Sequence, residues 1–196
     1  GGSFPLALGV LQILALDIGT DTLSAVALGS EAPSPHLLDG PPMSGRLMDR
    51  TVLRRAFGVL GPTIAAVSML AFVASLVVQG WRPGGTLPDA AGIAAASGAA
   101  FLTVVLGQKA NAFACRSSTR RPGQLGWRSN RLLLWSTAIE LAFAATVAFV
   151  GPIARELDHQ GPLLVGWLIA FAAIPMVLAV DAWDKRLHRR GSGTRS

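Results

Sequence analysis

Apolar residues in this chain form long blocks that are separated by polar segments rich in arginine, proline and glycine. Each block is long enough for a helix that crosses a hydrocarbon core, which needs roughly 20 helical residues. The pattern predicts five membrane-spanning helices, at residues 4–29, 56–78, 90–114, 132–151 and 163–180. We therefore expect one all-α integral membrane domain over residues 1–196, built as a five-helix bundle, with a disordered tail at 191–196.

Composition supports this class, since 51% of the 196 residues are hydrophobic and only 14% are charged. About 25% charged residues is usual in a soluble domain. The net charge of +6 would suggest nucleic acid in a soluble protein, but here the basic residues lie between apolar blocks. We therefore expect membrane lipid as a partner, and no nucleic acid.

The basic residues also predict an orientation. The four connections and the C-terminal tail hold four, one, five, one and five lysines and arginines in chain order. Loops rich in lysine and arginine stay on the cytoplasmic side. The N-terminus is then expected outside and the C-terminus in the cytoplasm, in a multi-pass protein of the cell membrane.

Two aspartates in the first apolar block need an explanation, because a carboxylate at mid-membrane costs about 2.5–3.5 kcal/mol on insertion scales. On a helix, Asp17, Thr20 and Asp21 share one face. Their oxygens suit a hard cation. Gly19 can loosen the helix there, so that backbone carbonyls join the site. The structural alternative is a pair of protonated carboxyls bonded to neighbouring helices.

Polar side chains recur in the third and fourth blocks. Gln108 and Asn111 lie on one side of a helix, where they either bond to another helix or line an ion path. Lys109 is expected to snorkel toward the cytoplasmic end as an anchor. Glu140, at mid-depth, is expected to carry a proton, to complete a cation site, or to bond to another helix as a neutral acid.

Two structural expectations concern the helix ends and prolines. We expect kinks at Pro62 and Pro175, because proline lacks the N–H of a helical hydrogen bond. The polar cluster after the fifth block is expected to be a solvated helix end, comprising Asp181, Asp184, Lys185 and Arg186.

The first block carries a family resemblance. Residues 12–23, Gln-Ile-Leu-Ala-Leu-Asp-Ile-Gly-Thr-Asp-Thr-Leu, with Ala-Val-Ala-Leu-Gly at 25–29, resemble the sixth transmembrane helix of P-type cation-transporting ATPases of the calcium and sodium/potassium type. Weaker resemblances at 108–117, at 130–140 and at the basic tail after Asp181 extend the likeness to helices eight, nine and ten. The five predicted spans then correspond to helices six to ten of such a pump.

The resemblance implies a cation site. In the family, the residues that match Asp17, Thr20 and Asp21 bind the transported cation, and those that match Asn111 and Glu140 add ligands in some members. Calcium, sodium, potassium and magnesium all suit such oxygen ligands. The family usually has proline where this chain has Ser24, a departure that affects the geometry just after the site.

The chain has no D-K-T-G phosphorylation motif and no Gly-rich phosphate loop, nucleophile elbow or zinc pattern. ATP and magnesium are then expected to act only through domains outside this chain. The expected partners are the remaining helices and the cytoplasmic domains of the pump. Because residues 1–5 hold no methionine, we expect the chain to begin inside a longer protein. The alternative is a free-standing five-helix membrane protein, either a packing module or a passive cation pathway, with no ATPase activity.

Overall fold

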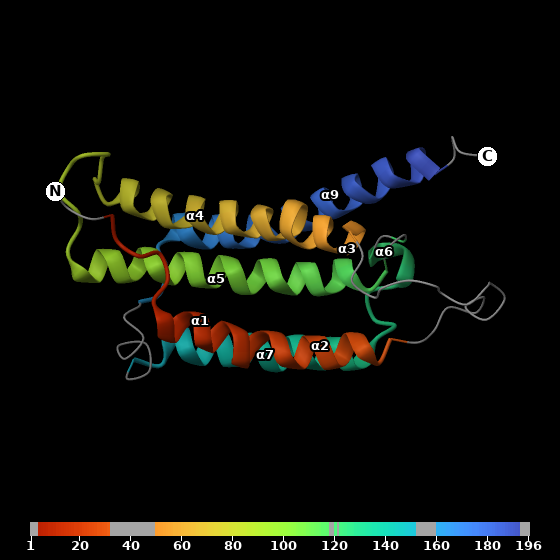
Figure 1. The fold of residues 1–196 in the computed structure, drawn as a ribbon. Coiled ribbons are helices and arrows are strands. Elements are labelled where there is room, and N and C mark those ends of the chain that lie inside the picture. The colour runs from red at the N-terminus through yellow and green to blue at the C-terminus, as the bar shows by residue number, and fades with distance from the viewer. Residues whose placement is uncertain (1–3, 32–49, 118–119, 121, 152–159, 193–196) are drawn as a thin grey trace.

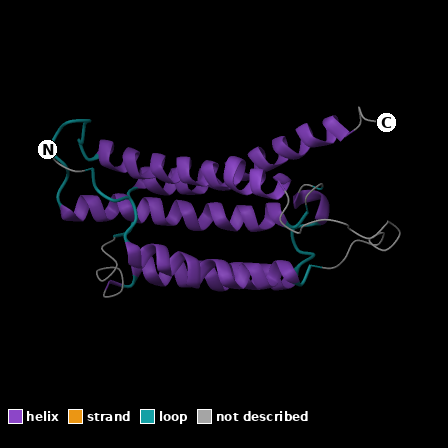
Figure 2. Cartoon of the chain, viewed as in Figure 1, coloured by secondary structure: helices purple, strands orange, loops and turns teal. Residues whose placement is uncertain are grey.

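The computed structural model describes residues 4–31, 50–117, 120, 122–151 and 160–192. Every regular element within these ranges is a helix (Figure 2). Two of the long helices contain a π-helical turn. Their segments are α1 (Val10–Leu16), η1 (Asp17–Asp21) and α2 (Thr22–Gly29), then α3 (Arg50–Arg55), η2 (Ala56–Leu60) and α4 (Gly61–Val78). The others are α5 (Ala90–Cys115), the short α6 (Pro122–Leu125), α7 (Arg131–Phe149) and α9 (Leu164–Ser192).

Within the described residues, five helices are long and apolar enough to cross a membrane, which confirms the prediction of an all-α membrane bundle. Their bounds differ from the apolar blocks at some ends. The first helix begins only at Val10, after Pro5 and Gly9, and the second is already helical at Arg50, where the described residues resume. The last continues through Gly191 and Ser192, the first two residues of the predicted tail. Residues 193–196 lie outside the described part.

Helix α5 is the centre of the bundle (Figure 1). Helices α4 and α9 lie on one side of it, and the α1–η1–α2 helix lies with α7 on the other. Small residues on α5 allow the close approach, as in other membrane bundles. Ala96 and Ala100 pack against Phe72 of α4, and a Cβ added to Gly166 of α9 would lie 2.5 Å from the Cβ of Ala99.

The two membrane prolines have different surroundings. Pro62 stands in the first turn of α4, directly after η2. A Cβ at the neighbouring Gly61 would lie 2.7 Å from the carbonyl oxygen of Ala56, so the wide turn needs glycine here. Pro175 lies inside α9, whose C-terminal part diverges from α4 (Figure 1).

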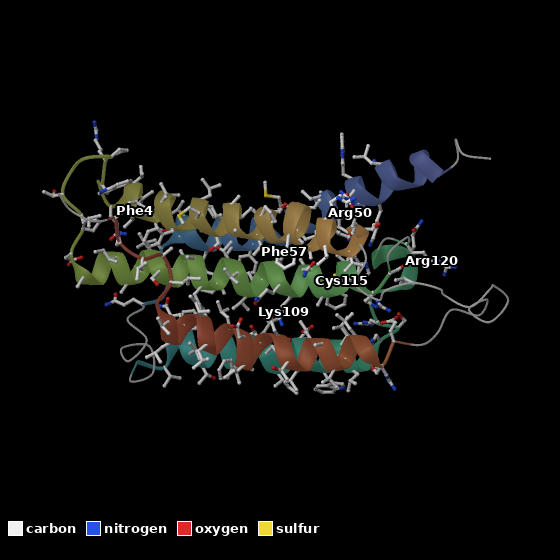
Figure 3. The ribbon with its side chains drawn as sticks, viewed as in Figure 1. Phe4, Arg50, Phe57, Lys109, Cys115 and Arg120 are labelled. Carbon is white, nitrogen blue, oxygen red and sulfur yellow. The ribbon has the colours of Figure 1, made fainter. Side chains whose placement is uncertain are left out.

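Arg50 and Arg120, from two of the basic connections, lie at one end of the bundle, whereas Phe4 lies at the other end (Figure 3). This arrangement is what the positive-inside rule requires of cytoplasmic connections. Which end faces the cytoplasm stays a prediction.

The expected solvated end of α9 is wrong, because its acids are buried in ion pairs. Asp181 is fully buried and pairs with Arg55 and, at 2.8 Å, with Lys185. Asp184 is also buried and pairs with Arg54 through two bonds of 3.0 and 3.3 Å. Sequence distance concealed these pairs, since both arginines come from the start of the second helix. The pairs join α3 to α9.

A second ionic contact closes the end of α2. Arg116 donates to both carboxylate oxygens of Glu31, at 2.6 and 2.9 Å. Asn130 donates to the Glu31 carboxylate at 2.8 Å and to the Ala27 carbonyl at 3.0 Å. The bonds from Arg116, with that from Asn130, hold the pKa of Glu31 below its usual value, although partial burial opposes the shift. This contact links α2, α5 and the start of α7.

Candidate functional site

The predicted cation-binding stretch forms the π-helical turn η1, in the middle of the first membrane helix. π-helical turns are rare and often occur at functional sites. Gly19, at the centre of the turn, lies where α7 approaches: a Cβ there would lie 2.0 Å from Cε1 of Phe143. The expectation that the helix loosens at Gly19 therefore takes the form of a wider turn, and not of a broken helix.

The wide turn separates the three residues that sequence spacing placed on one face. Thr20 is fully buried and Asp21 is partly buried, whereas Asp17 is exposed on the outside of the described bundle. The Thr20 hydroxyl bonds to the Leu16 carbonyl at 2.6 Å. Thr20 and Asp21 thus face the bundle interior, and Asp17 faces away from it.

Gln108 of α5 connects Thr20 to Asp21. Its amide nitrogen donates to the Asp21 carboxylate at 3.0 Å, and its amide oxygen lies 3.3 Å from the Thr20 hydroxyl. Of the two roles expected for Gln108, the hydrogen bond to another helix is therefore present. These contacts place a carboxylate, an amide oxygen and a hydroxyl oxygen together, and oxygen atoms of this kind are ligands for hard cations.

Lys109 is the neighbouring residue on α5, and its predicted role as a snorkelling anchor is wrong. Its side chain, only 6% exposed, extends into the space between α5 and the layer formed by α1–α2 and α7 (Figure 3). The ammonium donates to the Thr20 carbonyl, to the Ser24 hydroxyl at 3.1 Å and to the Glu140 carboxylate. The lysine is therefore an interior cation in the candidate site.

Glu140 of α7 is fully buried opposite this lysine. One carboxylate oxygen accepts the Ser24 backbone N–H at 2.8 Å, and the other accepts the Ser24 hydroxyl at 2.7 Å together with the ammonium of Lys109. These bonds between Glu140, Ser24 and Lys109 connect α2, α5 and α7.

Ser24 is the residue whose importance the sequence concealed. It stands where the resemblance leads to an expectation of proline, and that departure was the available signal. A proline has neither the backbone N–H nor the hydroxyl that bind Glu140. Ser24, Lys109 and Glu140 therefore form one hydrogen-bonded group in this chain, and each of them bonds to the other two.

Asn111 is not brought together with the other candidate ligands. It lies on the side of α5 that faces α3, η2 and α4, and lines a groove of about 420 Å³ with Arg55, Gly61 and Cys115, among other residues. Its side-chain oxygen lies 3.5 Å from the Cys115 sulfur. Gln108 faces η1, whereas Asn111 faces the groove beside α3, η2 and α4, so the two side chains do not share one side of α5.

Within the described ranges, no group of three or more histidine, cysteine, aspartate or glutamate side chains is placed to hold a metal ion. A cation bound near Asp21 would therefore need hydroxyl, amide or carbonyl oxygens, or groups from outside this chain. The exposed carboxylate of Asp17 is available to such outside groups.

A family model described as "Cation transporting ATPase, C-terminus" matches residues 5–187. The chain is similar to the sodium/potassium-transporting ATPase subunit alpha of Drosophila melanogaster, with 24% identity over 209 residues that cover 92% of the chain and 20% of that protein.

Two further relatives match a similar share of the chain. The subunit alpha-2 of Gallus gallus is 25% identical over 97% of the chain and 21% of its own length. The subunit alpha-3 of Homo sapiens is 23% identical over 97% of the chain and 22% of its own length. The chain therefore spans about a fifth of the length of the curated relatives that it matches.

Proposed function

The chain belongs to the family of cation transporting ATPase C-terminal regions, and from this premise we propose that it supplies intramembrane ligands for a transported cation. It is the C-terminal membrane part of a P-type cation ATPase, in a multi-pass integral membrane protein. The free-standing module or passive pathway is not favoured by the family match.

The observation that carries the proposal is the contact of Asp21 with Gln108 beside the buried Thr20. Three oxygen-bearing side chains from two helices meet at a π-helical turn in mid-membrane. A purely structural helix has little reason to keep a carboxylate there, given the insertion cost of about 2.5–3.5 kcal/mol. Asp21 and Thr20 are the proposed ligands on this side of the site.

Asp17 is proposed as a ligand that depends on the rest of the pump. Its carboxylate is exposed in the described bundle, next to the exposed Ile18 on the same helix. A bare aspartate against lipid is unfavourable, so the helices outside this chain are the proposed cover for this face. They would bring the further oxygens that a cation with six or more ligands requires.

Glu140 and Asn111, the other two candidates, are proposed for indirect roles. Glu140 is engaged by Ser24 and Lys109, so it would act on the site through the charge of the lysine. Asn111 faces the groove on the opposite side of α5 and would affect the site through the position of that helix. ATP and magnesium would act through cytoplasmic domains outside this chain.

The test is Asp21→Asn in the full-length ATPase that contains this chain. We expect loss of cation-stimulated phosphorylation and turnover, because the substitution removes the ligand charge while it keeps the shape and an acceptor for Gln108. Thr22→Val is the matched control, since Thr22 is exposed on the same helix one position away. Normal cation-stimulated turnover of Asp21→Asn would refute the assignment.

A further inference from the structure

We propose that the Lys109 ammonium is a built-in cation, which permanently occupies a position beside Asp21 that a free monovalent cation would otherwise take. The inference deepens the proposed function and rests on it for the neighbouring site. Lys109 would then determine how many free cations bind among the membrane helices.

The surroundings of the ammonium are those of a bound cation. Its three partners are a backbone carbonyl, a hydroxyl and a carboxylate, contributed by Thr20, Ser24 and Glu140. Hard cations in proteins are bound by the same three kinds of oxygen. Two of these residues belong to the first membrane helix and one belongs to α7, so the ammonium on α5 connects three helices.

Both carboxylate oxygens of Glu140 are engaged while the lysine stays in place. Both of its oxygens accept hydrogen bonds, and the side chain is fully buried. Ser24 fits this arrangement, because its hydroxyl donates to Glu140 and accepts from Lys109. A free cation at Glu140 would therefore have to displace the ammonium, which is tethered and always present.

Thr20 connects the contacts around Lys109 to the contacts around Asp21. The Thr20 hydroxyl faces Gln108 and, through it, Asp21, whereas the Thr20 carbonyl accepts from Lys109. The ammonium neutralises one carboxylate, that of Glu140, and leaves the charges of Asp21 and Asp17 for the transported ion. Removal of the ammonium would leave a buried carboxylate without its counter-charge, which is strongly unfavourable unless another cation replaces it.

The experiment measures the number of thallous ions, Tl⁺, bound at equilibrium per molecule of the full-length protein in lipid nanodiscs. Three substitutions separate charge from volume. Lys109→Ala removes both charge and side-chain volume, Lys109→Met removes the charge but fills the space, and Lys109→Arg keeps the charge. We expect Lys109→Ala to bind one more Tl⁺ than the wild type, and the other two variants to bind no additional ion.

Lys109→Ala/Glu140→Gln identifies where the extra ion binds, and is expected to return the count to the wild-type value. Stability provides a second measurement, in case Lys109→Ala folds poorly without an added ion. Tl⁺ should then raise the melting temperature of Lys109→Ala in a saturable way, and should raise it by more than it raises that of the double variant, which lacks the additional ion.

Two results would overturn the proposal. One is a folded Lys109→Ala protein with an unchanged ion count. The other is a Lys109→Ala protein that stays unfolded at every Tl⁺ concentration. Failure of the proposed function is read separately, from cation-stimulated turnover of Asp21→Asn, whereas this inference is read from the additional ion at Glu140.

Discussion

Asp181→Asn tests whether the ionic end of α9 is a buried network or a solvated surface. The Asp181 side chain is fully buried, and its partners Arg55 and Lys185 are only 15% and 3% exposed. The substitution keeps the shape but leaves two interior cations without their carboxylate. Removal of one partner from a buried pair costs about 3–5 kcal/mol, whereas a surface pair contributes about 0–1 kcal/mol.

The structure favours the lower part of the range of about 3–5 kcal/mol that applies to a buried pair. Lys185 would still donate to the carbonyls of Ala114 and Arg120, at 2.9 and 3.0 Å, so it would keep two of its partners. Arg55 would still donate to the Ala114 carbonyl at 3.3 Å. We therefore expect a loss of about 3 kcal/mol in the free energy of unfolding. That loss lowers the melting temperature, because unfolding then becomes favourable at a lower temperature.

The assay is thermal unfolding of the full-length protein in lipid nanodiscs, with Asp184→Asn as the matched control. Asp184 lies three residues further along the same helix, and its partner Arg54 is 43% exposed. Because Arg54 can stay in contact with solvent when its partner is removed, the control should lower the melting temperature less than Asp181→Asn does. Equal and small shifts for the two variants would refute the buried network and restore the solvated end.

Two further predictions follow from contacts of single residues. Gly19→Ala should cost about 1–3 kcal/mol, because the new Cβ would lie 2.0 Å from the Phe143 ring; Gly29→Ala, with no atom within 4 Å of its added Cβ, is the control, and equal melting temperatures would contradict the close approach. The lowered pKa of Glu31 means that its stabilising contact is fully formed above the usual pKa of about 4.3 and is lost as pH falls through the lower folded value. Melting temperature should therefore decrease in acid, and Glu31→Gln should reduce that decrease; an unchanged pH profile in the variant would count against the contact.

The membrane class and the number of helices could be predicted from the sequence because they depend on properties that are local along the chain. Block length, the scarcity of charge within blocks and the alternation of arginines between them need no tertiary information. The loosening of the helix at Gly19 was predictable for the same reason, since it follows from the missing side chain of one residue. The π-helical form of that turn was not, since it also depends on the contact with Phe143 of another helix.

The positions of charged side chains could not be predicted in this way. Lys109 is two turns from the end of its helix, so a path to the interface was open to it on geometric grounds. Its actual direction is set by Glu140, which comes 31 residues later. Asp181 likewise pairs with an arginine 126 residues earlier in the chain. Periodicity within one helix contains no information about such partners.

The spread of one polar cluster over three membrane helices has a consequence for biosynthesis. The first helix carries Asp17 and Asp21 and is the least hydrophobic of the five spans, so its insertion alone is weakly favourable. Its partner Lys109 is synthesised two spans later, and Glu140 follows in the next span. Until α7 has left the ribosome, a nascent chain therefore holds an unneutralised lysine within the bilayer. A chain that stops before this point would therefore keep a charge in the bilayer without its counter-charge, which is unfavourable.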